Sequence, residues 1–184
     1  MSDPVLRLVR EDDAAELAAL LTSNREFLAP WEPLRDPGWF TEAGQLTALT
    51  DALLRHAQGS SYPMVIELAD RIVGRANLNS IVRGAGQYAS VGYWVAESVT
   101  GRGIATAAVA ELRRTAFAGL NLHRLEAGTL PDNLASQRVL ERNGFTRYGF
   151  APDYVRIAGR WQDHVLYQAL NPDWSPGPAE AYAG

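Results

Sequence analysis

Two glycines stand where the phosphates of a ligand could be held. The segment SVTGRGIATAAVAEL places Gly101 and Gly103 between an expected strand and the first turn of an expected helix. Glycine lets the backbone approach a ligand closely, and the first amides of a helix have no partner within it, so they favour an anion. These amides belong to Gly103, Ile104, Ala105 and Thr106. The pattern predicts a pyrophosphate site, although a plain turn before a helix has similar glycines.

Two families of phosphate loop compete for this segment. A dinucleotide fingerprint would use Glu126, about 20 residues downstream, to hold a ribose. It fits poorly, because Thr106 replaces the third glycine or alanine and a long antiparallel stretch precedes the motif. The segment 100–105 instead resembles the pyrophosphate loop of GNAT acetyltransferases, with Thr100 replacing the usual Gln or Arg. Because backbone amides do most of the phosphate binding, the change at Thr100 weakens the match without removing the function.

Composition limits the class of protein. The chain has 184 residues, 47% of them hydrophobic, which is enough for one core but hardly for two. Because it has no cysteine and its three histidines are far apart, neither thiolate chemistry nor a metal site is expected. No long apolar run or signal-like start is present, so a cytoplasmic protein without a membrane partner is expected. The net charge of −4 and dispersed arginines disfavour direct nucleic-acid binding.

The pattern of apolar residues predicts a single domain over 1–170. Strands are expected at 5–9, 62–68, 72–78, 88–95, 124–127, 145–150 and 161–170. Helices are expected at 12–21, 41–56, 104–117 and 134–143, with an irregular loop at 24–39. The final segment, 171–184, is rich in proline, alanine and glycine and is expected to be a loose tail.

The chain resembles the RimJ type of GNAT acetyltransferase at several separated places. The matching blocks are NREFLAPWEP, NLNSIVRGAG, LHRLEAG, RVLERNGF, APDYVRIAGRWQDHVL and PDWSPG, between about Leu6 and Trp174. Not every GNAT protein requires PWEP or the WQDH stretch, so their joint order is more specific than the glycine loop. The resemblance implies an α+β fold with a mixed, mostly antiparallel sheet of about seven strands, flanked by helices. It also implies that the fourth and fifth strands splay apart around acetyl-coenzyme A (acetyl-CoA).

The resemblance also implies which residues hold the cofactor. The backbone of Tyr93, Trp94 and Val95 would bind the pantetheine arm like an added strand, with one free amide facing the thioester carbonyl. The pyrophosphate would lie on Gly101, Arg102, Gly103, Ile104, Ala105 and Thr106. Asn133 would contact the cofactor, and Ser136 would help to protonate the leaving thiolate. Asn133 is equally a good helix N-cap three residues before Ser136, and the two roles are compatible.

The acceptor amine must lose a proton before it attacks a thioester. An α-amino group has a pKa of about 8 and a lysine side chain about 10.4, so an N-terminal acceptor needs only a modest base. Glu32 in PWEP is the candidate base, directly or through a water, since its aromatic and proline neighbours could raise its pKa. A solvated surface glutamate is the alternative. Many RimJ and RimL relatives have a glutamate two residues before the Gly-Tyr of the fourth strand, where this chain has Ser90.

Other polar residues rank below Glu32. Residues of the C-terminal blocks could line the peptide side, and two asparagines on the third strand could bind a peptide backbone. They are Asp153, Tyr154, Asp163 and His164, and Asn77 and Asn79.

The expected activity is direct acetyl transfer in a ternary complex, because the chain has neither a cysteine nor a Gly-x-Ser-x-Gly elbow. Its expected catalytic residues are Ser136, Glu32 and Asn133. The expected acceptor is the N-terminal residue, alanine foremost, of a ribosomal protein. A small amine such as an amino sugar or polyamine is the alternative acceptor, and a non-catalytic acyl-CoA sensor is the alternative function. The acyl group beyond acetyl and the oligomeric state stay open, with a homodimer as the family-level expectation.

Overall fold

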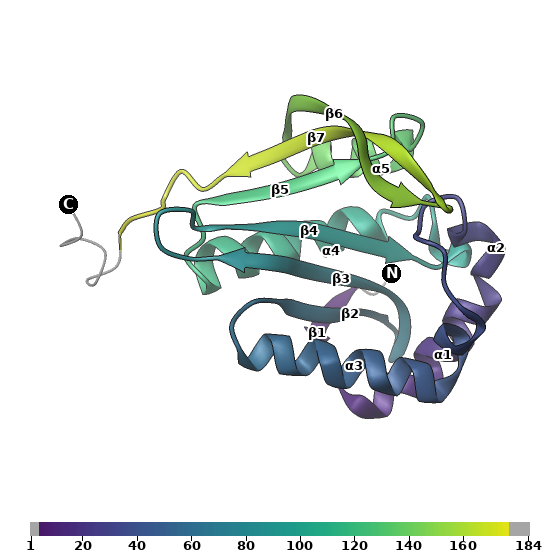
Figure 1. Ribbon diagram of the computed structural model, residues 1–184. Coiled ribbons are helices and arrows are strands. Elements are labelled where there is room, and N and C mark those ends of the chain that lie inside the picture. The colour runs from purple at the N-terminus through teal and green to yellow at the C-terminus, as the bar shows by residue number, and fades with distance from the viewer. Residues whose placement is uncertain (1–3, 177–184) are drawn as a thin grey trace.

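A seven-stranded mixed sheet forms the centre of the protein in the computed structural model, which describes residues 4–176 (Figure 1). The strand order is β1-β2-β3-β4-β5-β7-β6. The strands are β1 (Val5–Leu8), β2 (Tyr62–Leu68), β3 (Arg71–Val82), β4 (Tyr88–Val95), β5 (Arg124–Thr129), β6 (Thr146–Ile157) and β7 (Arg160–Leu170). Every neighbouring pair is antiparallel except β4 and β5, which run parallel. The expected α+β fold is confirmed.

Helices cover both faces of the sheet. They are α1 (Ala14–Ser23), α2 (Arg25–Leu28), α3 (Glu42–Ala57), α4 (Ile104–Arg114) and α5 (Leu134–Arg142). Short 3-10 turns occupy 11–13, 37–40 and 97–99, and one π-helical turn covers 115–119. In Figure 1, α3 crosses the sheet near β2 while α4 and α5 lie behind β3, β4 and β5.

The alternation of side chains along β3 separates the core from the functional face. Ala76 and Leu78 are fully buried and pack in the cluster that contains Ile104, Ala108 and Leu112, an apolar stripe of α4. Arg75 and the asparagines that alternate with them point to the opposite face, as the period of a strand requires. A second cluster, made by Leu17, Leu49, Val65 and Ile72, holds α1 and α3 on the edge of that face.

The central pair of strands parts along its length, as the resemblance implies. β4 and β5 pair only at Tyr88 with Arg124, Ala89 with Leu125 and Ser90 with Glu126. Residues 91–95 of β4 stay paired with β3, while 127–129 of β5 stay paired with β7. The backbone groups of 91–95 that face β5 are therefore left without a strand partner.

The largest difference from the expected elements lies in β6. This strand runs from Thr146 to Ile157, well past the expected end at Phe150, and its register with β7 shifts between Arg147 and Gly149 and between Ala151 and Val155. Each shift breaks the alternation of side chains, so the period of two that marks a strand fades from the sequence. The loop expected at 24–39 likewise contains α2 and a 3-10 turn at Pro37–Phe40.

The start of the expected tail is attached to the domain. Asn171 is buried, and its side-chain amide donates to the carbonyl oxygen of Leu122 at 3.1 Å. Trp174 packs edge-on against His123. The expectation of a loose segment beginning at Asn171 is therefore corrected for 171–176, while 177–184 lie outside the described residues.

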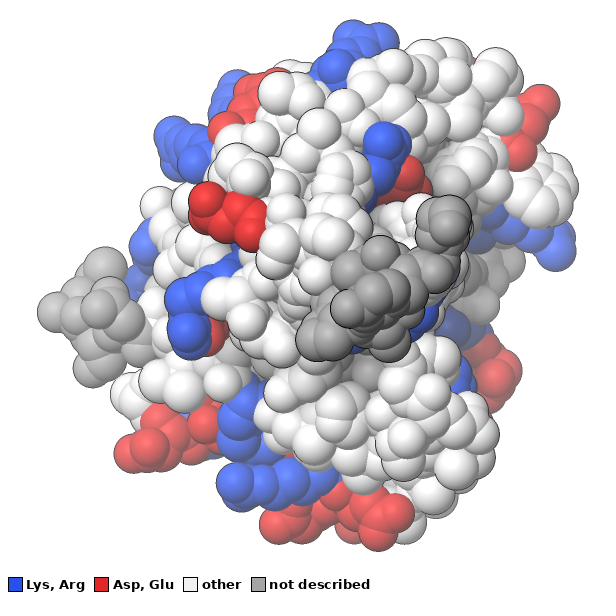
Figure 2. Space-filling model, turned by 90° about the vertical axis from the view of Figure 1, so that its left-hand side faces the viewer, with Lys and Arg blue, Asp and Glu red and all other residues white. Residues whose placement is uncertain are grey.

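Charged side chains of both signs are interspersed on the molecular face shown in Figure 2. No helix within 4–176 is long and apolar enough to cross a bilayer.

Candidate active site

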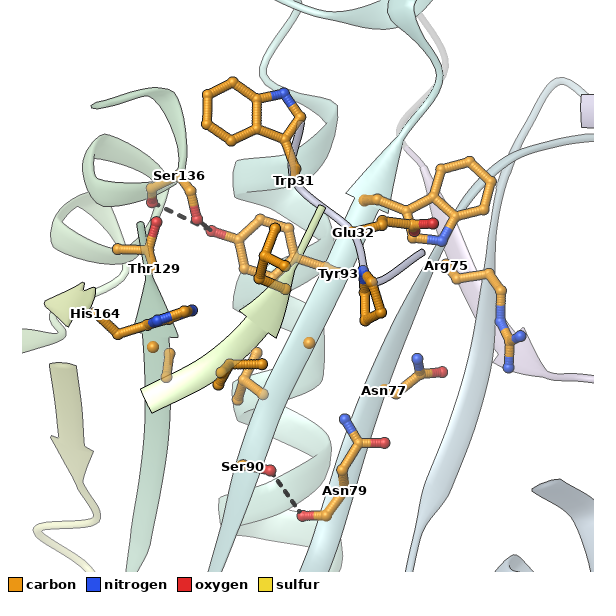
Figure 3. A pocket seen from close by; sticks show the side chains of 18 of the residues that line it. Trp31, Glu32, Arg75, Asn77, Asn79, Ser90, Tyr93, Thr129, Ser136 and His164 are labelled. Atoms are coloured by element: carbon orange, nitrogen blue, oxygen red, sulfur yellow. Dashed lines mark hydrogen bonds between the residues drawn. The ribbon is translucent and has the colours of Figure 1, made fainter. Parts of the chain in front are cut away.

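A cleft of about 880 Å³ opens over the face of the sheet that bears the polar side chains of β3, at the point where β4 and β5 part (Figure 3). Its floor comes from β3, β4, β5 and β7, and its walls from α3, the loop after α2 and β6. The lining residues on the floor include Arg75, Asn77, Asn79, Ser90, Gly92, Trp94, Glu126, Gly128, His164 and Leu166. Tyr93, Thr129, Asn133 and Ser136 line the gap itself.

Tyr93 and Ser136 meet across the gap. The Tyr93 hydroxyl lies 2.9 Å from Ser136 Oγ and 3.2 Å from the carbonyl oxygen of Ser136. Burial raises the pKa of Tyr93 to about 12, with the hydrogen bond from Ser136 acting in the opposite direction. The phenol therefore keeps its proton at neutral pH and can donate it. Packing against the core accounts for the position of the Tyr93 ring but not for the hydrogen bonds of its hydroxyl.

Asn133 caps α5. Its Oδ1 accepts a hydrogen bond from the amide of Ser136 at 3.0 Å, the geometry of a helix N-cap. The cap fixes the first turn of α5 and, with it, the position of the Ser136 hydroxyl. Asn133 also lines the cleft, so capping leaves its side chain beside the gap.

The glycine loop has the backbone that the sequence predicts. Gly101 and Gly103 have φ of 71° and 80°, and no atom lies within 4 Å of a Cβ built on either glycine. Glycine is therefore needed for the left-handed conformation, and the space above both residues is open. Ala107 is the residue whose amide donates back to Gly103, so the amides of 104–106 precede the hydrogen-bond ladder of α4.

This loop does not line the cleft. It follows β4 through the 3-10 turn at Glu97–Val99, and Arg102 is exposed there. The glycine loop thus follows the unpaired edge of β4 along the chain, and that edge carries Tyr93, which contacts Ser136. A helix N-terminus followed by an unpaired strand edge fits a diphosphate joined to an extended amide-bearing arm, which is the chemistry of coenzyme A.

Glu32 reaches the cleft from the loop after α2. The amide of Ala158, at the turn between β6 and β7, donates to the carbonyl oxygen of Glu32 at 2.9 Å and holds this loop against the sheet. Burial raises the pKa of the Glu32 carboxyl, while the charges of Arg35 and Arg75 lower it by less. Among the described residues, no side chain donates a hydrogen bond to this carboxylate. Glu32 is therefore not the fully solvated glutamate that the sequence allowed.

Arg75 was not expected in the site. It is largely buried, its pKa is lowered by that burial, and its Nε has no protein partner within the described residues. Asn77 Oδ1 is likewise buried without a partner in this part of the chain. An arginine followed by two alternating asparagines on one strand face was the available signal, but a solvent-facing strand would show the same alternation.

The remaining predicted residues divide between the cleft and the surface. Tyr154 and His164 line the cleft. Asp163 accepts a hydrogen bond from the amide of Asp153 at 3.0 Å, and neither of these two carboxylates lines it. Ser90 donates to the carbonyl oxygen of Asn79 at 3.3 Å and cannot act as the carboxylate that many relatives have there. No group of three or more His, Cys, Asp or Glu within 4–176 is arranged to hold a metal ion.

A mixed sheet with one parallel, parted pair of strands, a glycine loop at the head of the next helix and a cleft at the parting point defines the acyl-CoA N-acyltransferase class. A family model described as an acetyltransferase (GNAT) domain matches residues 5–146. The ribosomal protein uS5-alanine N-acetyltransferase of Escherichia coli (strain K12) is 37% identical over 185 residues, which cover 94% of this chain and 90% of the relative.

Two solved structures are similar over nearly the whole chain. The ribosomal-protein-S5-alanine acetyltransferase of Vibrio fischeri has a TM-score of 0.90 at 32% identity, covering 96% of this chain and 97% of that one. Mycobacterium smegmatis RimJ, in complex with CoA-disulfide, has a TM-score of 0.89 at 34% identity, covering 97% of this chain and 86% of that one. The chain belongs to the GNAT acetyltransferase family, within its RimJ and RimL group, and is an N-acetyltransferase.

Proposed function

We propose that the protein transfers the acetyl group of acetyl-CoA to the α-amino group of an N-terminal residue, alanine foremost, of a ribosomal protein. The observation that carries the proposal is the cleft at the parting of β4 and β5, with the Tyr93–Ser136 pair in the gap. The similarity to an alanine N-acetyltransferase of ribosomal protein uS5 over most of both chains supports the acceptor. Because that acceptor is ribosomal, the cytoplasm is the proposed place of action.

Acetyl-CoA supplies an acetyl group activated as a thioester. We assign its diphosphate to the amides of the glycine loop, 101–106, and its pantetheine arm to the unpaired backbone of β4 at Tyr93, Trp94 and Val95. The left-handed glycines and the missing strand partner beyond Ser90 support this assignment. Asn133 acts by capping α5 and so holds Ser136 in place.

Ser136 and Tyr93 form the proton-donating end of the site. A thiolate leaves far more readily when a proton reaches its sulfur, and these two hydroxyls form a hydrogen-bonded donor pair in the gap. Glu32 is the carboxylate that we propose meets the ammonium group of the acceptor, in direct contact or through a water. The amine attacks directly, without an acetylated enzyme, because the chain has no cysteine and the side chain that contacts Ser136 Oγ is the Tyr93 phenol, which is not a base at neutral pH.

A peptide library tests donor, acceptor and position together. The protein is incubated with acetyl-CoA and peptides that differ at the first residue and carry the N-terminal sequences of ribosomal proteins, and the products are read by mass spectrometry. Acetylation of the α-amine with a preference for alanine supports the proposal. A matched set with blocked N-termini and free lysines is the control.

Three results would redirect the proposal. Turnover of amino sugars or polyamines, with no peptide acetylated, would move the enzyme to small amines. Tight coenzyme A binding without acetylation of any amine would favour a sensor. A covalent acetyl adduct on the protein would reject direct transfer. The homodimer implied by the resemblance stays a prediction, which sedimentation of the purified protein tests.

A further inference from the structure

His164 is a buried histidine in the cleft. The sequence indicates only that it could line the peptide side, and the proposed function gives it no part in the reaction. His164 is only 6% exposed to solvent, yet it lines the cleft. Figure 3 shows its ring directed from β7 into that space. The two other histidines do not line this cleft: His56 packs against Tyr62 and His123 against Trp174.

The hydrogen bond of the ring defines its tautomer. His164 Nδ1 lies 3.0 Å from the carbonyl oxygen of Gln162. A carbonyl oxygen only accepts, so Nδ1 must carry the hydrogen of this bond. In a neutral imidazole the other nitrogen then holds a free lone pair. That nitrogen, Nε2, is at the end of the ring away from Cβ, and the ring points into the cleft.

The surroundings hold the ring beside the gap. A Cβ built on Gly128 would lie 3.3 Å from His164 Cδ2, so the ring rests against the backbone of β5 where a larger residue would press on it. Gly128 is two residues beyond Glu126, the last β5 residue that pairs with β4. Tyr154 of β6 also contacts the imidazole edge-on, with ring centroids 5.6 Å apart.

We infer that His164 Nε2 is the atom that accepts the proton from the acceptor's ammonium group. The inference rests on the proposed function, because it concerns the amine in the same cleft. His164 Nε2 takes one proton from the ammonium group, and the neutral amine that remains attacks the acetyl carbon. As the carbon–sulfur bond breaks, the thiolate takes a proton from the Tyr93–Ser136 pair, and the second proton of the attacking nitrogen restores that pair. His164 returns its own proton to solvent through the open cleft.

Glu32 is the rival for this step. Burial raises the pKa of its carboxyl, and the charges of Arg35 and Arg75 lower it by less. Geometry favours His164, because its Nδ1 is fixed as a donor to Gln162 and the lone pair of Nε2 is on the end of the ring that points into the cleft. We therefore assign attraction of the ammonium group to the Glu32 carboxylate and removal of the proton to His164.

Two substitutions remove the basic nitrogen of His164, and each places an amide at a different position of the lost ring. His164→Asn places an amide nitrogen where Nδ1 was and can still donate to Gln162, whereas His164→Gln extends an amide toward the Nε2 position. His123→Asn is the matched control, since this exposed histidine packs on Trp174 far from the lining of the cleft. Steady-state acetylation of the best peptide from the library is measured for all variants between pH 6.5 and 9.5.

We expect both His164 variants to lose about 10² to 10⁴-fold in kcat at pH 7, the usual contribution of a positioned acid or base, with the KM for acetyl-CoA unchanged. The deficit should shrink as the pH rises past about 8, because an increasing share of the α-amine is then already neutral. His123→Asn should behave as wild type. Imidazole added to His164→Ala should restore part of the activity, which a structural role for the ring would not allow.

A different set of results would overturn the inference. Wild-type kcat in both folded His164 variants would do so, as would a loss that is the same at every pH or one seen only in the KM for acetyl-CoA. Loss of the pH-dependent step in Glu32→Gln, with His164→Asn unaffected, would transfer the role to Glu32. Thermal denaturation checks that each variant folds. If one variant does not fold, imidazole rescue of His164→Ala tests whether the ring acts as the base. A wild-type enzyme that acetylates no peptide would contradict the proposed function instead.

Discussion

The hydroxyl of Tyr93 lies 2.9 Å from Ser136 Oγ, and this contact joins β4 to the first turn of α5 across the gap between the parted strands. The ring of Tyr93 packs against the core cluster that contains Ile104, and the Asn133 cap fixes Ser136. Two hydroxyls are thus held in hydrogen-bond contact between rigid elements. Such a pair can pass a proton to a leaving group without rearranging the backbone.

Removal of either hydroxyl should slow the transfer. Ser136→Ala is expected to lower kcat about 10² to 10³-fold, and Tyr93→Phe about tenfold, because the serine still reaches the gap in the second variant. Tyr167→Phe is the control, since it removes a tyrosine hydroxyl that bonds Gln137 and Glu141 outside the cleft. Equal kcat values in all three variants would show that the thiolate takes its proton from elsewhere.

The glycine loop should be sensitive to a single methyl group. Gly103→Ala forces alanine into a left-handed conformation, at a cost of about 1 to 2 kcal/mol of stability, and should weaken coenzyme A binding about tenfold or more. Gly59→Ala is a matched control, because Gly59 has φ of 73° and equally open surroundings at the far end of α3. Calorimetric titration with coenzyme A distinguishes the two variants. Both should lose stability, but only Gly103→Ala should lose affinity for coenzyme A.

Replacing Glu32 with a neutral glutamine should stabilise the protein at pH values where the Glu32 carboxyl is ionised. Burial raises the pKa of Glu32, so the native state binds a proton more readily than the unfolded state, and wild-type stability falls as the pH rises through that interval. Glu32→Gln is therefore expected to melt at a higher temperature than wild type at pH 8, and at the same temperature near pH 4. Glu26→Gln, at an exposed position of α2, should show no such dependence. A lower melting temperature for Glu32→Gln at pH 8 would contradict the prediction.

Asp13 should dominate the loss of stability in acid. Burial alone would raise its pKa, but hydrogen bonds from the Arg7 guanidinium at 2.7 and 2.9 Å and from the Arg10 amide outweigh it, and the pKa is lowered. This stabilisation is present above the unfolded value of about 3.9 and is lost as the pH falls through the lower native value.

Asp13→Asn should accordingly destabilise the protein by about 3 kcal/mol at pH 7, the low end for breaking a buried ion pair, because Arg7 keeps Glu67 as a second partner. Its deficit relative to wild type should narrow below about pH 4. Urea denaturation at several pH values measures both effects. The exposed neighbour Asp12, changed to Asn, gives the baseline, and a constant deficit for Asp13→Asn at every pH would argue against the ion pair.

Helices and strands whose apolar residues recur with a regular period could be predicted from the sequence. Those in which that period is interrupted could not. β2 and β4 begin and end at the predicted residues, since their alternating and β-branched residues are bounded by turns. The full length of β6 was not predicted, because its bulges interrupt the alternation of side chains. The helix α2 was not predicted, because four residues are too few to show a helical period. The glycine loop could be predicted from its residues, because a positive φ and free helix amides are local properties of the chain.

Only the tertiary structure shows which polar side chains line the cleft together. Arg75, Glu32 and His164 come from three distant segments, and no local pattern distinguishes a strand face that meets solvent from one that lines a cavity. The tautomer of His164 likewise depends on a carbonyl oxygen that its strand places beside the ring. The sequence alone therefore determined the family, the sheet and the conformation of the glycine loop, which depend on local backbone preferences and ordered motifs. Tertiary structure decided which polar groups share the cleft, because burial and charge pairing arise only when distant segments pack together.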